Sequence, residues 1–179
     1  MIQAPENFVL VEIERKFQDQ QGGILVDTTW FPEEHATLEG IVRSAPVKIL
    51  CDGYRQIIGT VKAGDRVFFS YGTIFNYTLQ PDDDTPVYKN LIIFEGQEYW
   101  KVHISEVFFK MTDGIEMITN NVLVIPRSED SGFVEGVGKI GVNCKKGDTI
   151  FFEPQFAQQY SFFEQSYFII PASRVIAKT

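Results

Sequence analysis

The side chains used most often in catalysis and metal binding are scarce in this chain. It has two histidines and two cysteines among 179 residues. Cys51 and Cys144 form no Cys-X-X-Cys pair and have no zinc spacing. We interpret them as idle thiols of a reducing compartment, with a disulfide between them as the alternative. His35 and His103 suggest no Ser-His-Asp arrangement. We therefore expect no enzyme activity, no metal site and no cofactor.

Two acidic runs have the composition of a cation or acid–base site, but their spacing favours solvated surface. Asp82-Asp83-Asp84 is consecutive, whereas calcium loops usually place ligands at alternate positions. Glu33-Glu34 is typical of ordinary surface charge. The glycines between residues 132 and 141 lie next to predicted strands, and no βαβ unit of the nucleotide-binding kind follows them. We expect no phosphate loop in this chain.

Composition and charge exclude several classes of protein. Hydrophobic residues make up 44% and charged residues 22%, enough to form a buried core. Sixteen Lys and Arg against 24 Asp and Glu leave a formal charge of −8, which opposes binding to nucleic acid. No apolar run approaches the roughly 20 residues that span a bilayer. Met1–Glu6 lacks the features of a secretory signal. We expect a cytoplasmic protein with no nucleic-acid or membrane partner.

The elements that position these residues are predicted to be short strands. Valine, isoleucine and aromatic residues are abundant, and helical periodicity is absent beyond a turn or two. Asp52-Gly53 and residues 95–98 are predicted hairpin turns. The fold class is therefore all-β. The predicted strands are Phe8–Ile13, Leu38–Val42, Val47–Leu50, Gln56–Val61, Arg66–Phe69, Leu91–Phe94 and Tyr99–Ile104.

Four segments of the first half recur, in the same order, in the second half. Such collinear matches predict a duplicated β-domain, with a boundary near Thr112-Asp113-Gly114. The matching pairs are Asn7–Val11 with Asn120–Val124, Glu39–Ile41 with Glu135–Val137, Val61–Phe69 with Cys144–Phe152, and Tyr99–Lys110 with Tyr167–Lys178.

The second copy lacks connections that the first copy has. Only residues 125–134 separate its first two matched segments, and residues 138–143 are too short for the hairpin of Ala45–Thr60. The first half also contains an extra segment, Asn76–Asn90. Length changes of this kind are tolerated best in loops.

Five motifs of the first half follow one another in a recognisable order. They are a strand after Pro5, two glycines and three aliphatic residues at 22–26, a Glu-Gly-aliphatic strand at 39–42, a Gly-Asp turn and strand within 61–69, and Ser-Glu-Val at 105–107. This order resembles the small GroES-type co-chaperonins, which form a ring of β-barrels and cap a large chaperonin. The resemblance implies two GroES-like β-barrel domains in tandem. Residues 1–112 would carry the mobile loop and roof hairpin, and 113–179 would be a shorter barrel without them.

The resemblance also implies that the mobile loop binds the chaperonin through Gly22, Gly23, Ile24, Leu25 and Val26. Residues 17–23 are polar, and the aliphatic trio has no evident strand partner in the sequence. Burying each aliphatic side chain yields about 1.5–3 kcal/mol before costs, and ordering a flexible loop opposes that gain. One loop would bind weakly and a ring of loops by avidity. Alternatively, the trio is a buried strand after a turn.

The resemblance thus implies a co-chaperonin that caps a GroEL-like chaperonin ring and assists protein folding. Binding would be ATP-dependent, with ATP on the partner, and the chain would form a homo-oligomeric ring whose subunit number the duplication leaves open. The alternative is a structural or assembly protein, of a phage or a cell, built on the same barrel without chaperonin binding. Zinc-type alcohol dehydrogenases share this barrel, but the zinc ligands and the nucleotide-binding domain are missing here.

Overall fold

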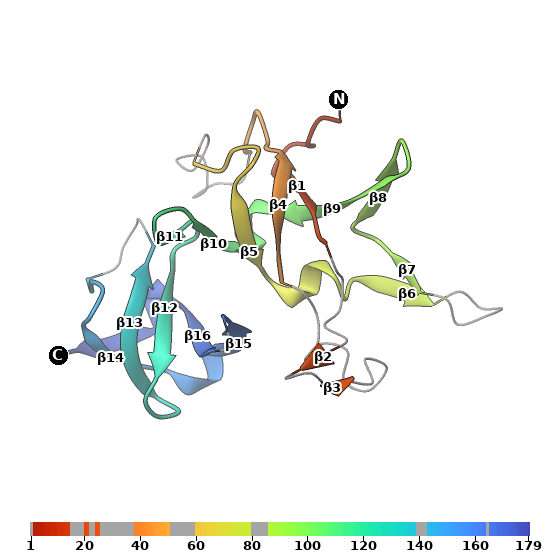
Figure 1. The fold of residues 1–179 in the computed structure, drawn as a ribbon. Helices are drawn as coiled ribbons and strands as arrows, with labels where there is room; N and C mark the ends of the chain where they lie inside the picture. The colour runs from red at the N-terminus through yellow and green to blue at the C-terminus, as the bar shows by residue number, and fades with distance from the viewer. Residues whose placement is uncertain are drawn as a thin grey trace. The chain divides into compact units, whose positions relative to one another are not determined.

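The computed structural model describes residues 2–14, 20–21, 24–25, 38–50, 60–79, 86–138, 143–163 and 165–179. They form antiparallel sheets joined by turns and 3-10 helices, which confirms the predicted all-β class (Figure 1). The chain divides into two compact units, Met1–Val107 and Phe108–Thr179. Within the described ranges, no helix is long and apolar enough to cross a membrane.

Unit 1 is organised around β1, which lies between two antiparallel neighbours. Val9, Leu10 and Val11 are all buried, which explains why this strand is apolar throughout rather than alternating. The strand order is β5 (Arg66–Phe69), β4 (Glu39–Ser44), β1 (Phe8–Glu12), β9 (Gln97–His103) and β8 (Leu91–Phe94). Two separate strand pairs are β2 (Gln20–Gln21) with β3 (Ile24–Leu25), and β6 (Tyr77–Leu79) with β7 (Pro86–Tyr88). The 3-10 helices are η2 (Tyr71–Thr73) and η3 (Ile104–Glu106).

Unit 2 contains a sheet built around β12. The strand order is β15 (Gln158–Phe162), β16 (Gln165–Pro171), β12 (Asn121–Pro126), β13 (Ser131–Val137), β14 (Thr149–Phe152) and β17 (Val175–Lys178). The hairpin of β10 (Val107–Met111) and β11 (Ile115–Met117) precedes it, and β10 begins at the last residue of unit 1. The 3-10 helices are η4 (Pro154–Phe156) and η5 (Ala172–Arg174). The core cluster comprises Val122, Val124, Val134, Ile150, Phe152 and Ile170.

The two units share one strand order and one register. The order β8-β9-β1-β4-β5 in unit 1 is repeated as β15-β16-β12-β13-β14 in unit 2. The central strand has an irregularity at the same place, just before Val11 in β1 and just before Val124 in β12. Val11 lies opposite Trp100, and Val124 lies opposite Phe168. These pairs agree with the sequence matches for the first and last segments.

The Gly-Asp turn before β5 is repeated before β14 with the same hydrogen bonds. Gly64 has φ +94° and Gly147 has φ +92°, a conformation that side chains rarely adopt. Oδ2 of Asp65 accepts the backbone N–H of the residue three positions earlier at 2.9 Å, and Oδ2 of Asp148 does so at 3.0 Å. The third sequence match therefore also joins equivalent residues.

The match between Glu39–Ile41 and Glu135–Val137 is wrong. The N–H of Val42 donates to the carbonyl of the turn aspartate at 2.9 Å, and the N–H of Val134 makes the same bond in unit 2 at 2.9 Å. Gly40 and Gly132 each stand two residues earlier, so Gly132 rather than Gly136 is the counterpart of Gly40. The alignment of Glu39–Ile41 with Glu135–Val137 contains more identical residues. The backbone hydrogen bonds, however, and not residue identity, define which positions are equivalent.

The predicted strand at Val47–Leu50 is not formed. Pro46 cannot donate to a ladder, and Val47 is 76% exposed. The segment is instead held by Asn7, whose Oδ1 accepts the N–H of Leu50 at 2.5 Å and whose N–H donates to the carbonyl of Lys48 at 3.3 Å. Residues 51–59, which include most of the second arm of this predicted hairpin, lie outside the described residues.

The hairpin between β8 and β9 is tighter than predicted. Its turn consists of Glu95 (φ 52°) and Gly96 (φ 79°) alone, because Phe94 pairs with Gln97. Two consecutive residues with positive φ are the signature of a type I′ turn, which matches the twist of the flanking strands.

Candidate functional site

The predicted docking segment lies between β1 and β4 and is described in part. Ile24 and Leu25 form β3 and pair with β2, with Gln21 opposite Ile24 and Gln20 opposite Leu25. The sequence suggested no strand partner for the aliphatic trio, and this backbone pairing corrects that expectation for its first two members. Gly22, Gly23 and Val26, as well as His35 and the Trp30-Phe31 pair, lie outside the described residues.

The two strands that carry this segment are fixed in the sheet at its base. Gly40 of β4 packs so closely on β1 that a Cβ there would lie 2.5 Å from the carbonyl oxygen of Glu12. The guanidinium of Arg66 donates two hydrogen bonds to Glu39, at 2.7 and 2.8 Å, across β4 and β5. Arg43 pairs with Glu12 across β4 and β1 at 2.5 Å. The segment therefore begins and ends on strands with a defined register.

Unit 2 closes the equivalent pair of strands with a short turn. Residues 127–130 alone join β12 to β13. The hydrogen bonds that hold the turn include one from the N–H of Arg127 to the carbonyl of Ser131 at 2.9 Å and one from Oγ of Ser128 to Asp130 at 2.7 Å. The long connection of residues 13–38 is thus particular to unit 1.

A second feature particular to unit 1 is the β6–β7 hairpin. In unit 2 a single residue, Ala157, separates η4 from β15, whereas in unit 1 this hairpin separates η2 from β8. Tyr77 and Tyr88 face each other with ring centroids 5.7 Å apart, and Tyr88 meets Trp100 edge-on at 5.4 Å. The sequence analysis did not predict these two strands. The strand-forming residues Tyr-Thr-Leu and Pro-Val-Tyr, on either side of an acidic run, could have indicated them. Asp82–Asp84 lies outside the described residues.

The environment of this hairpin changes the acidity of one hydroxyl. Burial raises the pKa of Tyr88 above its ordinary value, and the neighbouring Tyr77 raises it further. The edge-to-face contact of Tyr88 with Trp100 is the arrangement that aromatic rings prefer. The hairpin is therefore packed on the sheet through its aromatic residues.

The one histidine in the described part of the chain, His103, forms a local cap. Its Nδ1 lies 2.6 Å from Oγ of Ser105 and accepts the N–H of Ser105 at 3.3 Å, at the start of η3. A Ser-His contact is an element of nucleophilic catalysis, and here it satisfies the first turn of a 3-10 helix. In the described ranges, no group of three or more His, Cys, Asp or Glu residues is arranged to hold a metal ion.

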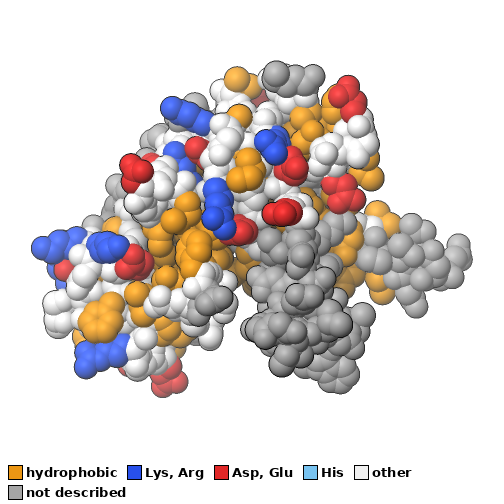
Figure 2. Space-filling model, in the orientation of Figure 1, with side chains coloured by type: hydrophobic (Ala, Val, Ile, Leu, Met, Phe, Trp, Pro, Cys, Tyr) orange, Lys and Arg blue, Asp and Glu red, His pale blue; other side chains and the backbone are white. Residues whose placement is uncertain are grey.

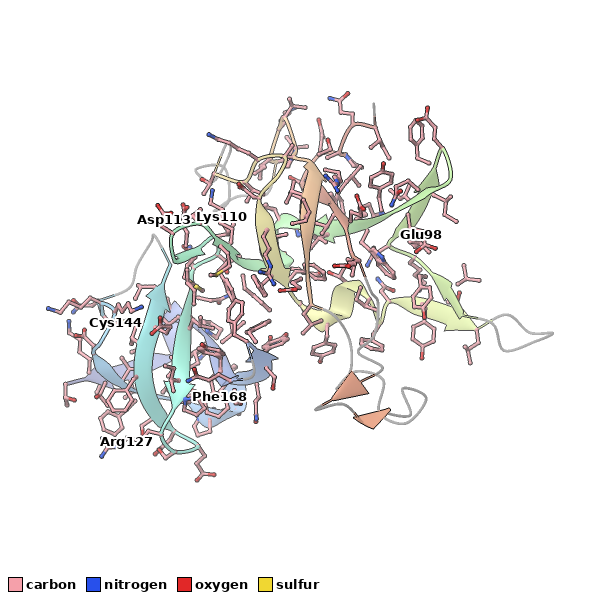
Figure 3. All side chains as sticks on the ribbon, in the orientation of Figure 1. Glu98, Lys110, Asp113, Arg127, Cys144 and Phe168 are labelled. Atoms are coloured by element: carbon pink, nitrogen blue, oxygen red, sulfur yellow. The ribbon has the colours of Figure 1, made fainter. Side chains whose placement is uncertain are left out.

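Cys144 is a free, half-buried thiol (Figure 3). Burial raises its pKa, Asp148 raises it further, and Lys178 opposes both effects. A raised pKa reduces the thiolate fraction and with it the reactivity of the group. Cys51 lies outside the described residues.

Comparison with known proteins leaves the chain without an assigned family. No protein-family model matches it. No curated protein matches its sequence either. The repeat, the inserted segment and the resemblance of the motifs are therefore the features that bear on its function.

Proposed function

We propose that this protein is a co-chaperonin of the GroES type, a cytoplasmic lid that caps an ATP-driven chaperonin ring and assists protein folding. The observation that carries the proposal is the contrast between two equivalent connections. Residues 13–38 join β1 to β4, whereas residues 127–130 join β12 to β13. A long connection present in one copy of a repeat and not in the other is where a function particular to that copy is expected.

The aliphatic residues of this connection suit a reversible docking contact. Transfer of Ile24, Leu25 and Val26 into an apolar groove contributes about 1.5–3 kcal/mol each before ordering costs. Pairing of β3 with β2 favours this role, because a segment with some backbone pairing loses less freedom on binding. Several copies in one ring multiply the contact by avidity.

The two units would be two GroES-like barrels with different tasks. Unit 1 would provide the docking loop, and unit 2, whose equivalent connection is a short turn, would widen or stabilise the lid. ATP would be bound and hydrolysed by the chaperonin, because the sequence of this chain predicts no phosphate loop. The number of subunits in the ring is left open by the presence of two units per chain.

Co-sedimentation with a bacterial chaperonin, with and without ATP, tests this proposal. We expect the wild type to sediment with the chaperonin only when ATP is present, and Ile24→Ser to stay in the supernatant. Val47→Ser is the matched control, because Val47 is an exposed aliphatic residue on a different segment of unit 1. It is expected to bind like the wild type.

Two results would argue against the proposal. A folded wild type that does not bind the cognate chaperonin would favour the alternative, a structural or assembly protein on the same fold. Equal loss of binding in Ile24→Ser and Val47→Ser would mean that the aliphatic trio is not the specific contact.

A further inference from the structure

The β6–β7 hairpin carries hydrophobic side chains that its packing on the sheet leaves exposed. Exposed hydrophobic side chains occur in both units (Figure 2), but this hairpin has no counterpart in unit 2. Leu79 is 55% exposed, Val87 45% and Tyr77 39%. Charged residues are absent from both strands of the hairpin. It therefore presents uncharged, strand-forming residues to its surroundings.

The outer edge of β6 carries backbone groups that face away from the hairpin. β6 and β7 form a sheet of their own, and no other strand in the described part of the chain pairs with either (Figure 1). The N–H of Lys89 donates to the carbonyl of Asn76 at 2.8 Å, so the backbone groups of Asn76 point toward β7. Because successive residues of a strand point their backbone groups to opposite sides, those of Tyr77 and Leu79 point away from β7. An edge of this kind is a template for another strand.

The outer edge of β7 is protected against such pairing. Pro86 lies opposite Leu79, so its backbone nitrogen also faces outward, and it has no hydrogen to donate. Lys89 follows the strand and is exposed, which brings a charge to this edge. Proline and lysine are residues that prevent pairing at the edges of natural sheets. β6 contains neither, so it is the edge to which a strand can be added.

We propose that β6 of one copy of this chain pairs with β6 of a second copy, antiparallel and with Thr78 on the two-fold axis. In this register Tyr77 lies opposite Leu79 of the second copy, and each such pair exchanges both of its N–H···O bonds. A two-stranded hairpin alone is marginally stable, whereas the two hairpins together form a sheet of ordinary size. The pairing therefore uses the backbone groups that the free edge presents.

The side chains of β6 are complementary to themselves in the same register, which is why the occupant is a second copy. On one face, the row formed by Tyr88 and Tyr77 continues to Leu79 of the second copy. On the other face, Thr78 pairs with Val87 within each hairpin, and the axis places the two threonines side by side. Threonine pairs across strands are favourable, and the whole row consists of β-branched residues.

Charge selects β6 and not β7 for this contact. Pairing through β7 would bring Lys89 of the two copies toward each other, and juxtaposed like charges oppose association. Pairing through β6 brings no charged strand residue to the axis. Because the two strands are short, the contact is small and reversible. A two-fold contact closes at two copies, so it differs from a ring contact, and it needs neither a chaperonin nor the connection of residues 13–38.

Disulfide cross-linking at the axis tests the register. In a Cys51→Ser, Cys144→Ser background, Thr78→Cys places two thiols in a non-hydrogen-bonded pair, where facing side chains are closest. We expect a covalent dimer in the presence of oxidised glutathione. Ser161→Cys is the matched control, because Ser161 is exposed on β15, an edge strand of unit 2, and it should give little or no dimer. No cross-link at Thr78→Cys, or equal cross-linking at both positions, would overturn the proposal.

Opposite charges at the same position give a second test, by sedimentation velocity of the full chain. Thr78→Lys and Thr78→Glu each place like charges at the axis, so each alone is expected to lose the paired species that the wild type forms. An equimolar mixture of the two variants is expected to recover it. Ser161→Lys and Ser161→Glu make the same changes of net charge on a different edge strand, and they should associate like the wild type.

Circular dichroism shows whether each variant is folded, and three results would overturn the proposal. They are unaffected Thr78 variants, a mixture that remains unpaired, and a wild type that is monomeric at every concentration, which would leave the edge to a strand of another protein. Because no chaperonin is present, these outcomes are independent of the binding test with Ile24→Ser.

Discussion

Gly40 and Gly132 occupy the same place in the two units. A Cβ on Gly40 would lie 2.4 Å from Cγ1 of Val11, and a Cβ on Gly132 would lie 2.4 Å from Cγ1 of Val124. The same added Cβ would lie 2.5 Å from the carbonyl oxygen of Glu12 in unit 1 and 2.4 Å from that of Ile125 in unit 2. The repeat is thus defined by a close approach of backbones, which one residue type alone permits.

Replacement of either glycine by alanine is expected to destabilise its own unit. The added methyl group would overlap a buried valine and a backbone oxygen, and overpacking of this kind costs about 1–3 kcal/mol of unfolding free energy. Urea denaturation of Gly40→Ala and Gly132→Ala measures the loss. Gly114→Ala is the control, because its Cβ would meet nothing within 4 Å. Equal midpoints for all three variants would contradict this account.

Thr73→Val is expected to destabilise unit 1 through a lost hydrogen bond. The buried hydroxyl of Thr73 donates to Oε2 of Glu106 at 2.8 Å, and valine has the same shape without the donor. Loss of a bond to a carboxylate costs about 1.5–3 kcal/mol. In unit 2 the equivalent contact is Arg174 over the ring of Phe156, at 3.9 Å.

The measurement for this prediction is the midpoint of urea unfolding of unit 1. Tryptophan fluorescence reports on this unit, because it contains the buried Trp100. Thr78→Val is the control, because Thr78 is exposed on β6. A fluorescence midpoint that is the same in Thr73→Val and Thr78→Val would show that the bond to Glu106 does not stabilise the unit.

The features that the sequence predicted well are local ones. The Gly-Asp turns at Gly64 and Gly147 need a positive φ, and that requirement is visible in the residue type alone. The central strands are buried on both faces, so their apolar runs indicate a strand without knowledge of its neighbours. The all-β class and three of the four repeat matches follow from such signals.

The features that were predicted poorly from the sequence depend on pairing between distant segments. The equivalence of Gly132 and Gly40 was missed because it depends on the register of β13 with β12. In the sequence alone, Glu135-Gly136-Val137 has more residues identical to Glu39-Gly40-Ile41. Val47–Leu50 has strand-forming residues, but Asn7 and not a neighbouring strand binds its backbone. The partner of Ile24 and Leu25 was missed because two glutamines carry no apolar alternation to mark β2.

The Asn7 contact yields a prediction for the segment that was expected to be a strand. Asn7 has φ 64°, and its Oδ1 accepts the N–H of Leu50. Asn7→Gly keeps the backbone conformation and loses this bond, whereas Asn7→Ala loses the bond and adds about 1–2 kcal/mol of left-handed strain. We expect faster hydrogen exchange at the Leu50 amide in both variants and a lower urea midpoint for the alanine variant.

Asn7→Asp is the control for this experiment, because a carboxylate oxygen also accepts the bond. It is expected to retain slow exchange at Leu50. Fast exchange in Asn7→Asp, or unchanged exchange in Asn7→Gly, would show that another group protects this amide.

The raised pKa of Cys144 predicts how the thiol reacts and how it contributes to stability. Burial and Asp148 favour the protonated form, and Lys178 favours the thiolate. In a Cys51→Ser background at about pH 8, alkylation of the folded protein by iodoacetamide should therefore be slower than alkylation of the urea-unfolded chain, because only the thiolate reacts. Lys178→Gln removes the group that lowers the pKa of Cys144, so it should slow the reaction further. Lys145→Gln is the control and should leave the rate unchanged, because Lys145 does not contribute to the shift.

The raised pKa of Cys144 also determines how the thiol contributes to the free energy of unfolding. The folded state holds the proton more tightly than the unfolded chain, so the stabilisation is complete below the ordinary cysteine pKa and is lost as the pH rises through the raised pKa. A folded Cys144 that reacts as fast as the unfolded chain would contradict both statements, since it would mean that neither burial nor Asp148 controls the thiol.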